Sequence, residues 1–180
     1  MSPRRPLISR LGTVMQLAFV PQDFDAALRH WTLTMGVGPF FSMEHISLPN
    51  CRYEGRPTDI DFSIAIAYWG DMQIELVRQH NDAPSIYKRW RDEGRQGLHH
   101  VCIVVDDMAE ARRVCLAADA RVAQEADVAG GGEVIYVDAG GGPGGLIELI
   151  QLPRATLEAF ASMREVCSHW DGRDPLRKLG

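Results

Sequence analysis

The sequence predicts an α+β fold made of two consecutive copies of one unit, in which a strand and a helix precede three further strands. Two repeated patterns support this prediction. The run V-M-Q-L-A-F-V at 14–20, before an acidic turn and a helix start, is matched by L-H-H-V-C-I-V-V at 98–105. The run G-D-M-Q-I-E-L-V at 70–77 is matched by P-G-G-L-I-E-L-I at 143–150. Internal repeats of this kind are a strong guide to the fold.

The first unit is expected over residues 11–80. It opens with an apolar run rich in β-branched and aromatic side chains, which is typical of a buried strand. Asp23 is a good N-cap for the helix that follows, and Gly36 and Gly38 end that helix. Its other segments are predicted strands at 39–48, 59–69 and 72–78, with a loop at 50–58.

A helical connector is expected at 81–96, and the second unit at 97–152. Its opening strand leads to a helix that begins after Asp107. The remaining predicted strands of this unit lie at 121–126, 133–138 and 146–152. The extra residues are expected to form a flexible N-terminal arm at 1–10 and a C-terminal helical extension at 153–180, frayed from Asp171 onward.

The composition excludes several classes of protein. The net charge of −5, from 19 basic and 24 acidic residues, argues against a nucleic-acid partner held through phosphates. No segment reaches the ~20 apolar residues of a membrane span, and the N-terminus lacks the apolar core of a signal peptide. We therefore expect a cytoplasmic protein without membrane contact. Its 4 cysteines, none in a CxxC pair, are expected to be reduced and structural.

Polar side chains interrupt four of the apolar strands at matched positions. Gln16 and His100 lie in the opening strands of the two units, and Glu75 and Glu148 lie in the closing strands. Because side chains alternate between the two faces of a strand, each unit offers one polar residue and one carboxylate to a shared face. For either glutamate alone, a solvent-facing position on a half-buried sheet is the ordinary alternative.

The residues around these positions fit a buried site. Ala18 and Cys102 share the face of Gln16 and His100 and are small enough to leave room there. His99 is expected to point to the opposite face. Two buried carboxylates carry a charge of −2, which a divalent cation would neutralise. One nitrogen and three oxygens suit zinc, nickel, cobalt, manganese or ferrous iron.

The pattern resembles the vicinal oxygen chelate superfamily, which includes glyoxalase I, methylmalonyl-CoA epimerase, extradiol dioxygenases and bleomycin-resistance proteins. The resemblance covers roughly residues 11–152. Its most specific parts are G-L-H-H-V-C-I-V-V-D-D at 97–107, G-D-M-Q-I-E-L-V at 70–77 and G-G-L-I-E-L at 144–149. It implies paired βαβββ modules whose mixed sheet forms a cup around a metal-centred cavity.

The resemblance also implies a ligand set of Gln16, Glu75, His100 and Glu148. This set is similar to that of animal-type glyoxalase I, which favours zinc. A glutamine in the first position counts against extradiol dioxygenase chemistry, and the complete set counts against a pure binding module. Val20 stands where the glyoxalase I branch carries an arginine for glutathione. The resemblance implies no organic cofactor.

The function expected from these residues is a metal-dependent isomerase or epimerase that moves a proton next to the carbonyl of a small chelating substrate. Glu148 is the expected base and Glu75 its partner. The alternatives are a lyase of the glyoxalase I type, acting on a glutathione or other thiol adduct, and a non-catalytic small-molecule binding protein. A homodimer is expected, as is common for such folds.

The walls of the cavity are harder to assign from the sequence. Candidate wall residues are Phe40, Tyr68, Trp69 and Tyr136, for each of which plain core packing is the alternative. The glycine-rich stretches at 129–133 and 138–145 match no phosphate-binding loop. We expect them to be mobile loops at the mouth of the cavity.

Overall fold

One mixed sheet of 11 strands dominates the computed structural model, which describes residues 7–179. The strands are β1 (Val14–Phe19), β2 (Phe40–Ile46), β3 (Arg52–Tyr53), β4 (Arg56–Pro57), β5 (Phe62–Trp69), β6 (Met72–Gln79), β7 (Leu98–Val104), β8 (Arg121–Asp127), β9 (Glu133–Asp138), β10 (Leu146–Ile150) and β11 (Leu176–Lys178). The helices are η1 (Ile8–Arg10), α1 (Phe24–Arg29), η2 (His30–Thr34), α2 (Ile86–Asp92), α3 (Met108–Ala117) and α4 (Arg154–Ser168). The predicted α+β class is confirmed.

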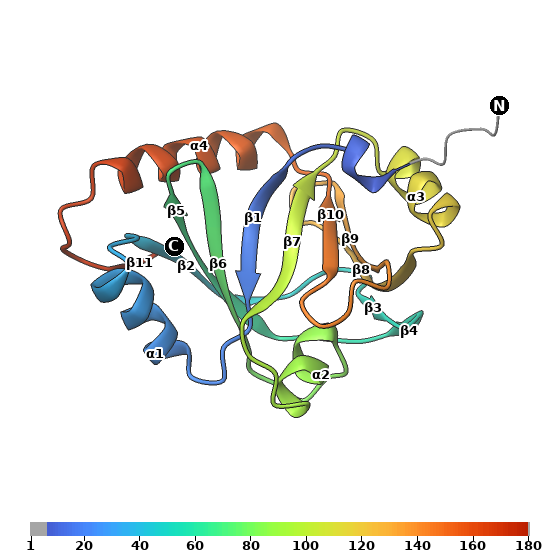
Figure 1. The fold of residues 1–180 in the computed structure, drawn as a ribbon, viewed down its shortest axis with the longest axis horizontal. Coiled ribbons are helices and arrows are strands. Elements are labelled where there is room, and N and C mark those ends of the chain that lie inside the picture. The colour runs from blue at the N-terminus through green and yellow to red at the C-terminus, as the bar shows by residue number, and fades with distance from the viewer. Residues whose placement is uncertain (1–6, 180) are drawn as a thin grey trace.

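The sheet has the order β11-β2-β5-β6-β1-β7-β10-β9-β8-β3-β4 (Figure 1). On one side of the middle the order is β1-β6-β5-β2, and on the other it is β7-β10-β9-β8, so each half places its strands in the same way. The halves meet where β1 runs antiparallel to β7, with Gln16 opposite Cys102 and Ala18 opposite His100. The closing strands β6 and β10 pair in parallel with β1 and β7.

The helices that follow the two opening strands begin in the same way. Oδ1 of Asp23 accepts a hydrogen bond from the Ala26 N–H at 2.8 Å, and Oδ1 of Asp107 accepts one from the Glu110 N–H at 3.1 Å. These side chains satisfy backbone donors that have no partner inside the helix. α1 packs on the side of the first half of the sheet that carries Ile74 and Leu76, and α3 packs on the side of the second half that carries Leu149, which leaves the other face for Glu75 and Glu148.

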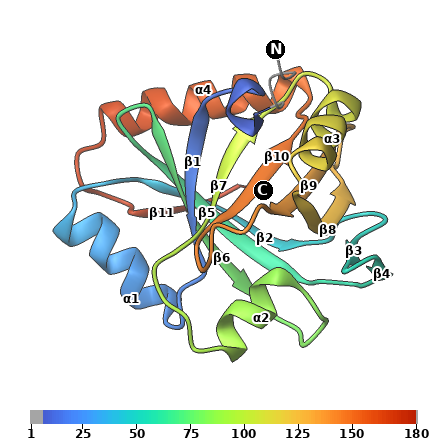
Figure 2. The same ribbon diagram turned by 45° about the vertical axis from the view of Figure 1, so that its right-hand side comes forward.

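The sheet curls until a segment of the first half reaches the outer strand of the second. The expected loop at 50–58 contains a small hairpin, in which β3 pairs with β4 and also with β8, with Arg52 opposite Glu125. Figure 2 shows this hairpin beside β8. The Asp127 N–H donates to the Pro49 carbonyl oxygen at 2.9 Å. The two halves therefore share one core on the inside of the curve.

The C-terminal residues differ from the expected frayed end. After α4, which packs on β5, the chain returns and adds β11 in parallel to β2, with Leu176 opposite Phe40. The Phe40 N–H donates to the Pro175 carbonyl oxygen at 2.8 Å. An edge strand presents unpaired backbone groups, and β11 satisfies part of that edge.

At the other end, residues 1–6 of the expected N-terminal arm lie outside the described residues, and Ile8–Arg10 forms η1. Within residues 7–179, no helix combines the length and the apolar character that a membrane crossing needs.

Candidate metal centre

Four neighbouring strands at the centre of the sheet bring the predicted polar residues to one face. The order β6-β1-β7-β10 places Glu75, Gln16, His100 and Glu148 on consecutive strands. Within this register Ala18 lies opposite both Glu75 and His100, and Cys102 lies opposite both Gln16 and Glu148. The small side chains of Ala18 and Cys102 thus occupy the positions between the larger polar ones.

The imidazole of His100 lies between the two carboxylates. Its Nε2 is 3.1 Å from Oε2 of Glu148 and 3.7 Å from Oε2 of Glu75. One ligand atom from each of the three residues lies within 4.8 Å of the other two. All three side chains are buried, with His100 fully enclosed. An imidazole and two carboxylates at this spacing form a donor set that a divalent transition metal can use.

The electrostatics of the site call for a positive charge. Burial raises the pKa of Glu75 well above its ordinary range, and the neighbouring Glu148 raises it further, while the Gln16 amide acts in the opposite direction. Two carboxylates cannot both remain ionised in a buried site unless a proton or a cation compensates them. A divalent cation would meet this need.

A pair of adjacent histidines determines which nitrogen of His100 faces the carboxylates. Nδ1 of His99 lies 2.7 Å from Nδ1 of His100, and Nε2 of His99 lies 3.3 Å from the Ile86 carbonyl oxygen. Since a carbonyl oxygen can only accept, His99 carries its proton on Nε2, and its Nδ1 accepts from the Nδ1–H of His100. The lone pair of His100 Nε2 then faces Glu75 and Glu148, which is the orientation of a metal ligand.

The position of His99 corrects the expectation that it lies on the opposite face. The register between β1 and β7 shifts by one residue, because Ala18 pairs with His100 while Phe19 pairs with Leu98. Such a bulge breaks the alternation of side chains and leaves the rings of His99 and His100 in contact, with centroids 5.0 Å apart. The alternation of side chains along a regular strand could not reveal this contact.

Gln16 presents a free oxygen to the site. Its Nε2 donates to Oε1 of Gln73 at 2.6 Å, and Nε2 of Gln73 donates in turn to the Tyr68 hydroxyl at 2.8 Å. Oε1 of Gln16 is buried and has no hydrogen-bond partner among the described residues. A buried acceptor left unpaired is costly, so an oxygen-binding cation fits here as well. Gln73 shares its face with Glu75, but its sequence position alone did not single it out.

Two tyrosines form the next layer around Glu148. The Tyr136 hydroxyl donates to Oε1 of Glu148 at 3.3 Å and lies 2.9 Å from the Tyr87 hydroxyl. Burial raises the pKa of Tyr136 well above its ordinary range, and Glu148 adds to this rise, so the phenol keeps its proton. Tyr136, a candidate wall residue, thus lies beside Glu148 and lines the cavity. Tyr87 was not predicted as a site residue. It comes from α2, and the strand repeat does not indicate where that helix packs.

A largely apolar cavity of about 180 Å³ opens in front of these residues. It reaches from Gln16, Glu75 and Glu148 to Thr156 and Phe160 of α4. No lysine or arginine is found among the described residues that line it. Its other lining residues are Met15, Met43, Ile46, Leu48, Phe62, Ile64, Gln73, Tyr87, Cys102, Val128, Val134, Tyr136, Ile150 and Leu152.

Three of the expected wall residues do not line this cavity. Phe40 is buried on the opposite face, among Ala65 and Leu76, and Trp69 is largely exposed beside Trp31. The pleat explains this, because Trp69 alternates with Tyr68 and so points away from the face of Glu75. Tyr68 is on the correct face, where its hydroxyl accepts from Gln73 and does not reach the cavity.

The two glycine-rich stretches lie in different places. The first, at 129–133, turns between β8 and β9 beside Val128 and Val134 of the cavity wall. The second, at 138–145, borders a separate hollow of about 320 Å³ next to Trp90. The expectation that both stretches lie at the mouth of the cavity is therefore corrected for the second. The two stretches are successive turns of an antiparallel run, β8–β9 and β9–β10, so they lie at opposite ends of β9.

A comparison of the chain with known protein families is consistent with this geometry. The chain matches the family model of the Glyoxalase/Bleomycin resistance protein/Dioxygenase superfamily over residues 15–137. No curated protein matches the sequence. The chain belongs to this superfamily, as the sequence motifs indicate, and members of this superfamily typically bind a divalent metal and are commonly enzymes.

Solved structures share the fold at low sequence identity. A methylmalonyl-CoA epimerase from Streptomyces coelicolor, a variant in complex with 2-nitronate-propionyl-CoA, is 16% identical with a TM-score of 0.57, covering 80% of this chain and 96% of that one. The methylmalonyl-CoA epimerase from Mycobacterium tuberculosis is 15% identical with a TM-score of 0.52, covering 80% and 91%. The hypothetical protein BH1468 from Bacillus halodurans C-125 is 14% identical with a TM-score of 0.55, covering 79% and 95%.

Proposed function

We propose that this protein is a metal-dependent isomerase or epimerase that moves a proton on the carbon next to a carbonyl group. The observation that carries the proposal is the buried pair of Glu75 and Glu148 on either side of His100 Nε2, which lies 3.7 Å and 3.1 Å from their oxygens. This arrangement combines a divalent-cation site with two carboxylates that can exchange protons with a substrate.

The metal would be held by Nε2 of His100, a carboxylate oxygen each of Glu75 and Glu148, and Oε1 of Gln16. Zinc suits one nitrogen and three oxygen ligands, and we propose it as the resident ion. When bound, the ion supplies Lewis acidity that makes the proton next to the substrate carbonyl more acidic.

The two oxygens of Glu148 have different surroundings, which suits it to act as the base. Oε2 faces His100, whereas Oε1 lies on the side of the Tyr136 hydroxyl. We assign proton abstraction to the carboxylate of Glu148, so that the C–H bond breaks and its electron pair is delocalised onto the carbonyl oxygen. The Tyr136 hydroxyl holds Glu148 in place through its hydrogen bond.

Glu75 is the group that returns a proton. Without an ion, burial and then Glu148 raise the pKa of Glu75 well above its ordinary range, so a Glu75 carboxylate that leaves the ion when substrate binds can hold a proton. Return of the proton to the opposite face of the same carbon gives epimerisation, and return to the neighbouring carbon gives isomerisation. The separate strands of the two glutamates, β6 and β10, support this division of roles.

The cavity indicates the size and charge of the substrate. About 180 Å³ of largely apolar space, with no lysine or arginine among the described residues that line it, suits the reacting end of a small, uncharged carbonyl compound. A glutathione adduct carries carboxylates that need cationic partners, and the lining within residues 7–179 does not supply them. The geometry therefore supports the isomerase or epimerase over the glyoxalase I type of lyase.

Solvent deuterium exchange tests this proposal. The zinc-loaded chain is incubated in D₂O with small chelating probes, such as an α-hydroxyketone and a β-ketoester, and deuterium incorporation is followed by NMR. We expect exchange with the zinc-loaded protein and none with the chelator-treated protein. Glu148→Gln is expected to slow exchange by about 10²–10⁴-fold, the usual contribution of a general base.

The control is Glu158→Gln on the exposed surface of α4, which is expected to exchange at the normal rate. Circular dichroism and zinc content are measured on the same samples. If Glu148→Gln exchanges as fast as the unchanged chain, Glu148 is not the base. If no probe exchanges although zinc is bound, the proposal gives way to a non-catalytic binding protein.

A further inference from the structure

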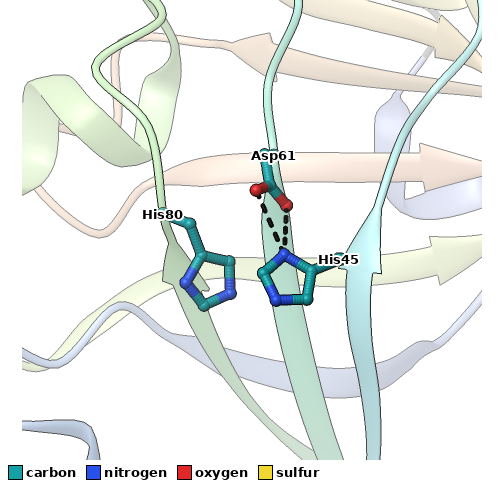
Figure 3. Close-up of side chains that lie close together, drawn as sticks. All are labelled: His45, Asp61 and His80. Carbon is teal, nitrogen blue, oxygen red and sulfur yellow. Dashed lines mark hydrogen bonds and ion pairs between the residues drawn. The ribbon is translucent and has the colours of Figure 1, made fainter.

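A second group of metal-ligating side chains lies at the ends of three neighbouring strands of the first half, β2, β5 and β6. His45 lies near the end of β2, Asp61 directly precedes β5 and His80 directly follows β6. Figure 3 shows the three side chains turned toward one another across these neighbouring strands. None of the three lines the cavity of the central site.

The distances suit a shared ion. Nδ1 of His45 lies 3.0 Å and 3.1 Å from the two carboxylate oxygens of Asp61. One ligand atom from each of the three residues lies within 4.8 Å of the other two. Ligands of a tetrahedral zinc ion bound at its usual bond lengths are ~3.4 Å apart. The His45–Asp61 spacing is already close to this, and His80 supplies the third ligand atom within 4.8 Å of the other two.

The backbone of His45 is shaped to hold its ring here. Met43 pairs with Ile64 and Ile46 with Phe62, so β2 carries one extra residue between these pairs. His45 adopts a positive φ of 55° in this bulge, a conformation that is uncommon for residues other than glycine. Bulges of this kind redirect a side chain, and here the imidazole is directed onto Asp61.

A buried serine joins the two histidines. Oγ of Ser63 accepts a hydrogen bond from the His45 N–H at 3.1 Å and lies 2.6 Å from Nε2 of His80. The His80 N–H donates to the Asp61 carbonyl oxygen at 2.7 Å. Backbone and side-chain contacts therefore fix all three residues relative to one another. Metal ligands are commonly supported by such outer hydrogen bonds.

We propose that His45, Asp61 and His80 form a second site for a divalent transition metal ion, with zinc as the probe. Two imidazoles and one carboxylate are a common zinc donor set, and the carboxylate supplies one negative charge. The site is open, because the His45 side chain is 67% exposed, so water or an external ligand completes the coordination. It is independent of the central site, with which it shares no residue.

Isothermal titration of zinc into the full-length, tag-free, chelator-stripped chain tests this site. We expect two zinc equivalents for the unchanged chain. We expect His45→Asn and Asp61→Asn each to weaken one of them more than about tenfold, since even an outer hydrogen-bond partner of a metal site contributes that much. Asparagine tolerates a positive φ, so His45→Asn preserves the bulge.

The matched control is His169→Asn, because His169 also lies near a surface carboxylate, 3.4 Å from Glu165, but without a second histidine. It is expected to leave both equivalents unchanged. The double variant Glu75→Gln/Glu148→Gln is expected to lose the central equivalent and keep the surface one, which separates this proposal from the function of the cavity. A single equivalent in the unchanged chain that His45→Asn and Asp61→Asn leave intact would overturn the proposal. So would two equivalents that neither variant affects.

Discussion

The side-chain amide of Gln16 donates through Nε2 to Oε1 of Gln73 across 2.6 Å, and this bond determines which end of Gln16 is free. Gln73 is held in turn by donating to Tyr68. The oxygen of Gln16 is thereby left unpaired in a buried site beside two carboxylates. Gln73, which is not a proposed metal ligand, thus orients Gln16, which is one.

Replacing Gln73 by methionine is expected to weaken zinc binding at the central site by about 10–100-fold, the usual effect of removing an outer partner. Without its acceptor, the amide of Gln16 can rotate and lose its orientation. Competition with a chromophoric chelator measures the affinity. Tyr68→Phe is the control, because it keeps the Gln16–Gln73 bond. An unchanged zinc affinity in Gln73→Met would show that the Gln16 amide keeps its orientation without Gln73.

Glu75 makes the metal-free protein sensitive to pH. Its pKa is raised by burial and by Glu148, so the folded chain holds a proton that the unfolded chain releases near the usual pKa of 4.5. The resulting stability is fully present below that pH and is lost as pH rises through the folded-state pKa. Glu75→Gln, which does not titrate, is expected to gain on the order of 1 kcal/mol at neutral pH in the metal-free state.

Melting temperatures of both proteins, taken between roughly pH 5 and 8 with a chelator present, measure this difference. The unchanged chain is expected to lose stability with rising pH more steeply than the variant. Glu158→Gln on α4 is the control and should keep the steep dependence. Parallel curves for Glu75→Gln and the unchanged chain would contradict the prediction.

His99 is expected to act as a positioning residue for His100. His99→Leu removes the acceptor that lies 2.7 Å from Nδ1 of His100, and zinc affinity should fall by about 10–100-fold. His99→Gln keeps an acceptor and should recover most of the affinity. The visible absorption of the cobalt-substituted protein gives a second measurement. An identical spectrum and affinity in His99→Leu would limit His99 to packing against Trp90.

The turn between β8 and β9 offers a matched pair of glycines. A Cβ on Gly132 would lie 2.1 Å from the Gln151 carbonyl oxygen, whereas a Cβ on Gly131 would meet nothing within 4 Å. Both residues have positive φ and so share the strain of an added side chain. Gly132→Ala is therefore expected to be at least about 2 kcal/mol less stable than Gly131→Ala in urea unfolding. Similar stabilities would show that the turn can move away from Gln151.

The fold and part of the site could be predicted because both depend on short, regular patterns. Alternation along a strand placed Gln16, Glu75, His100 and Glu148 on shared faces, and the repeat matched them in pairs. The structure brings one ligand atom of each of Glu75, His100 and Glu148 within 4.8 Å of the others. Side chains alternate between the two faces with a period of two residues in any regular strand, so this pattern can be recognised from the sequence alone.

The same rule failed where the strands are irregular. A bulge beside His99 brought its ring onto His100, and another at His45 created a cluster with Asp61 and His80. Each bulge arises from pairing between strands distant in the sequence, as its register with the partner strand shows. The roles of these histidines could not be recognised from their own surroundings in the chain.

Local sequence determined the strands, the capped helices and the candidate donors of the central site, because each depends on the chemistry of a few adjacent residues. Tertiary structure alone decided that Tyr87 approaches Glu148 through Tyr136, that β11 pairs with β2, and that Phe40 faces away from the cavity. These relationships depend on how a curved sheet brings distant segments together. These relationships are stabilised by contacts that form only when the whole chain has folded.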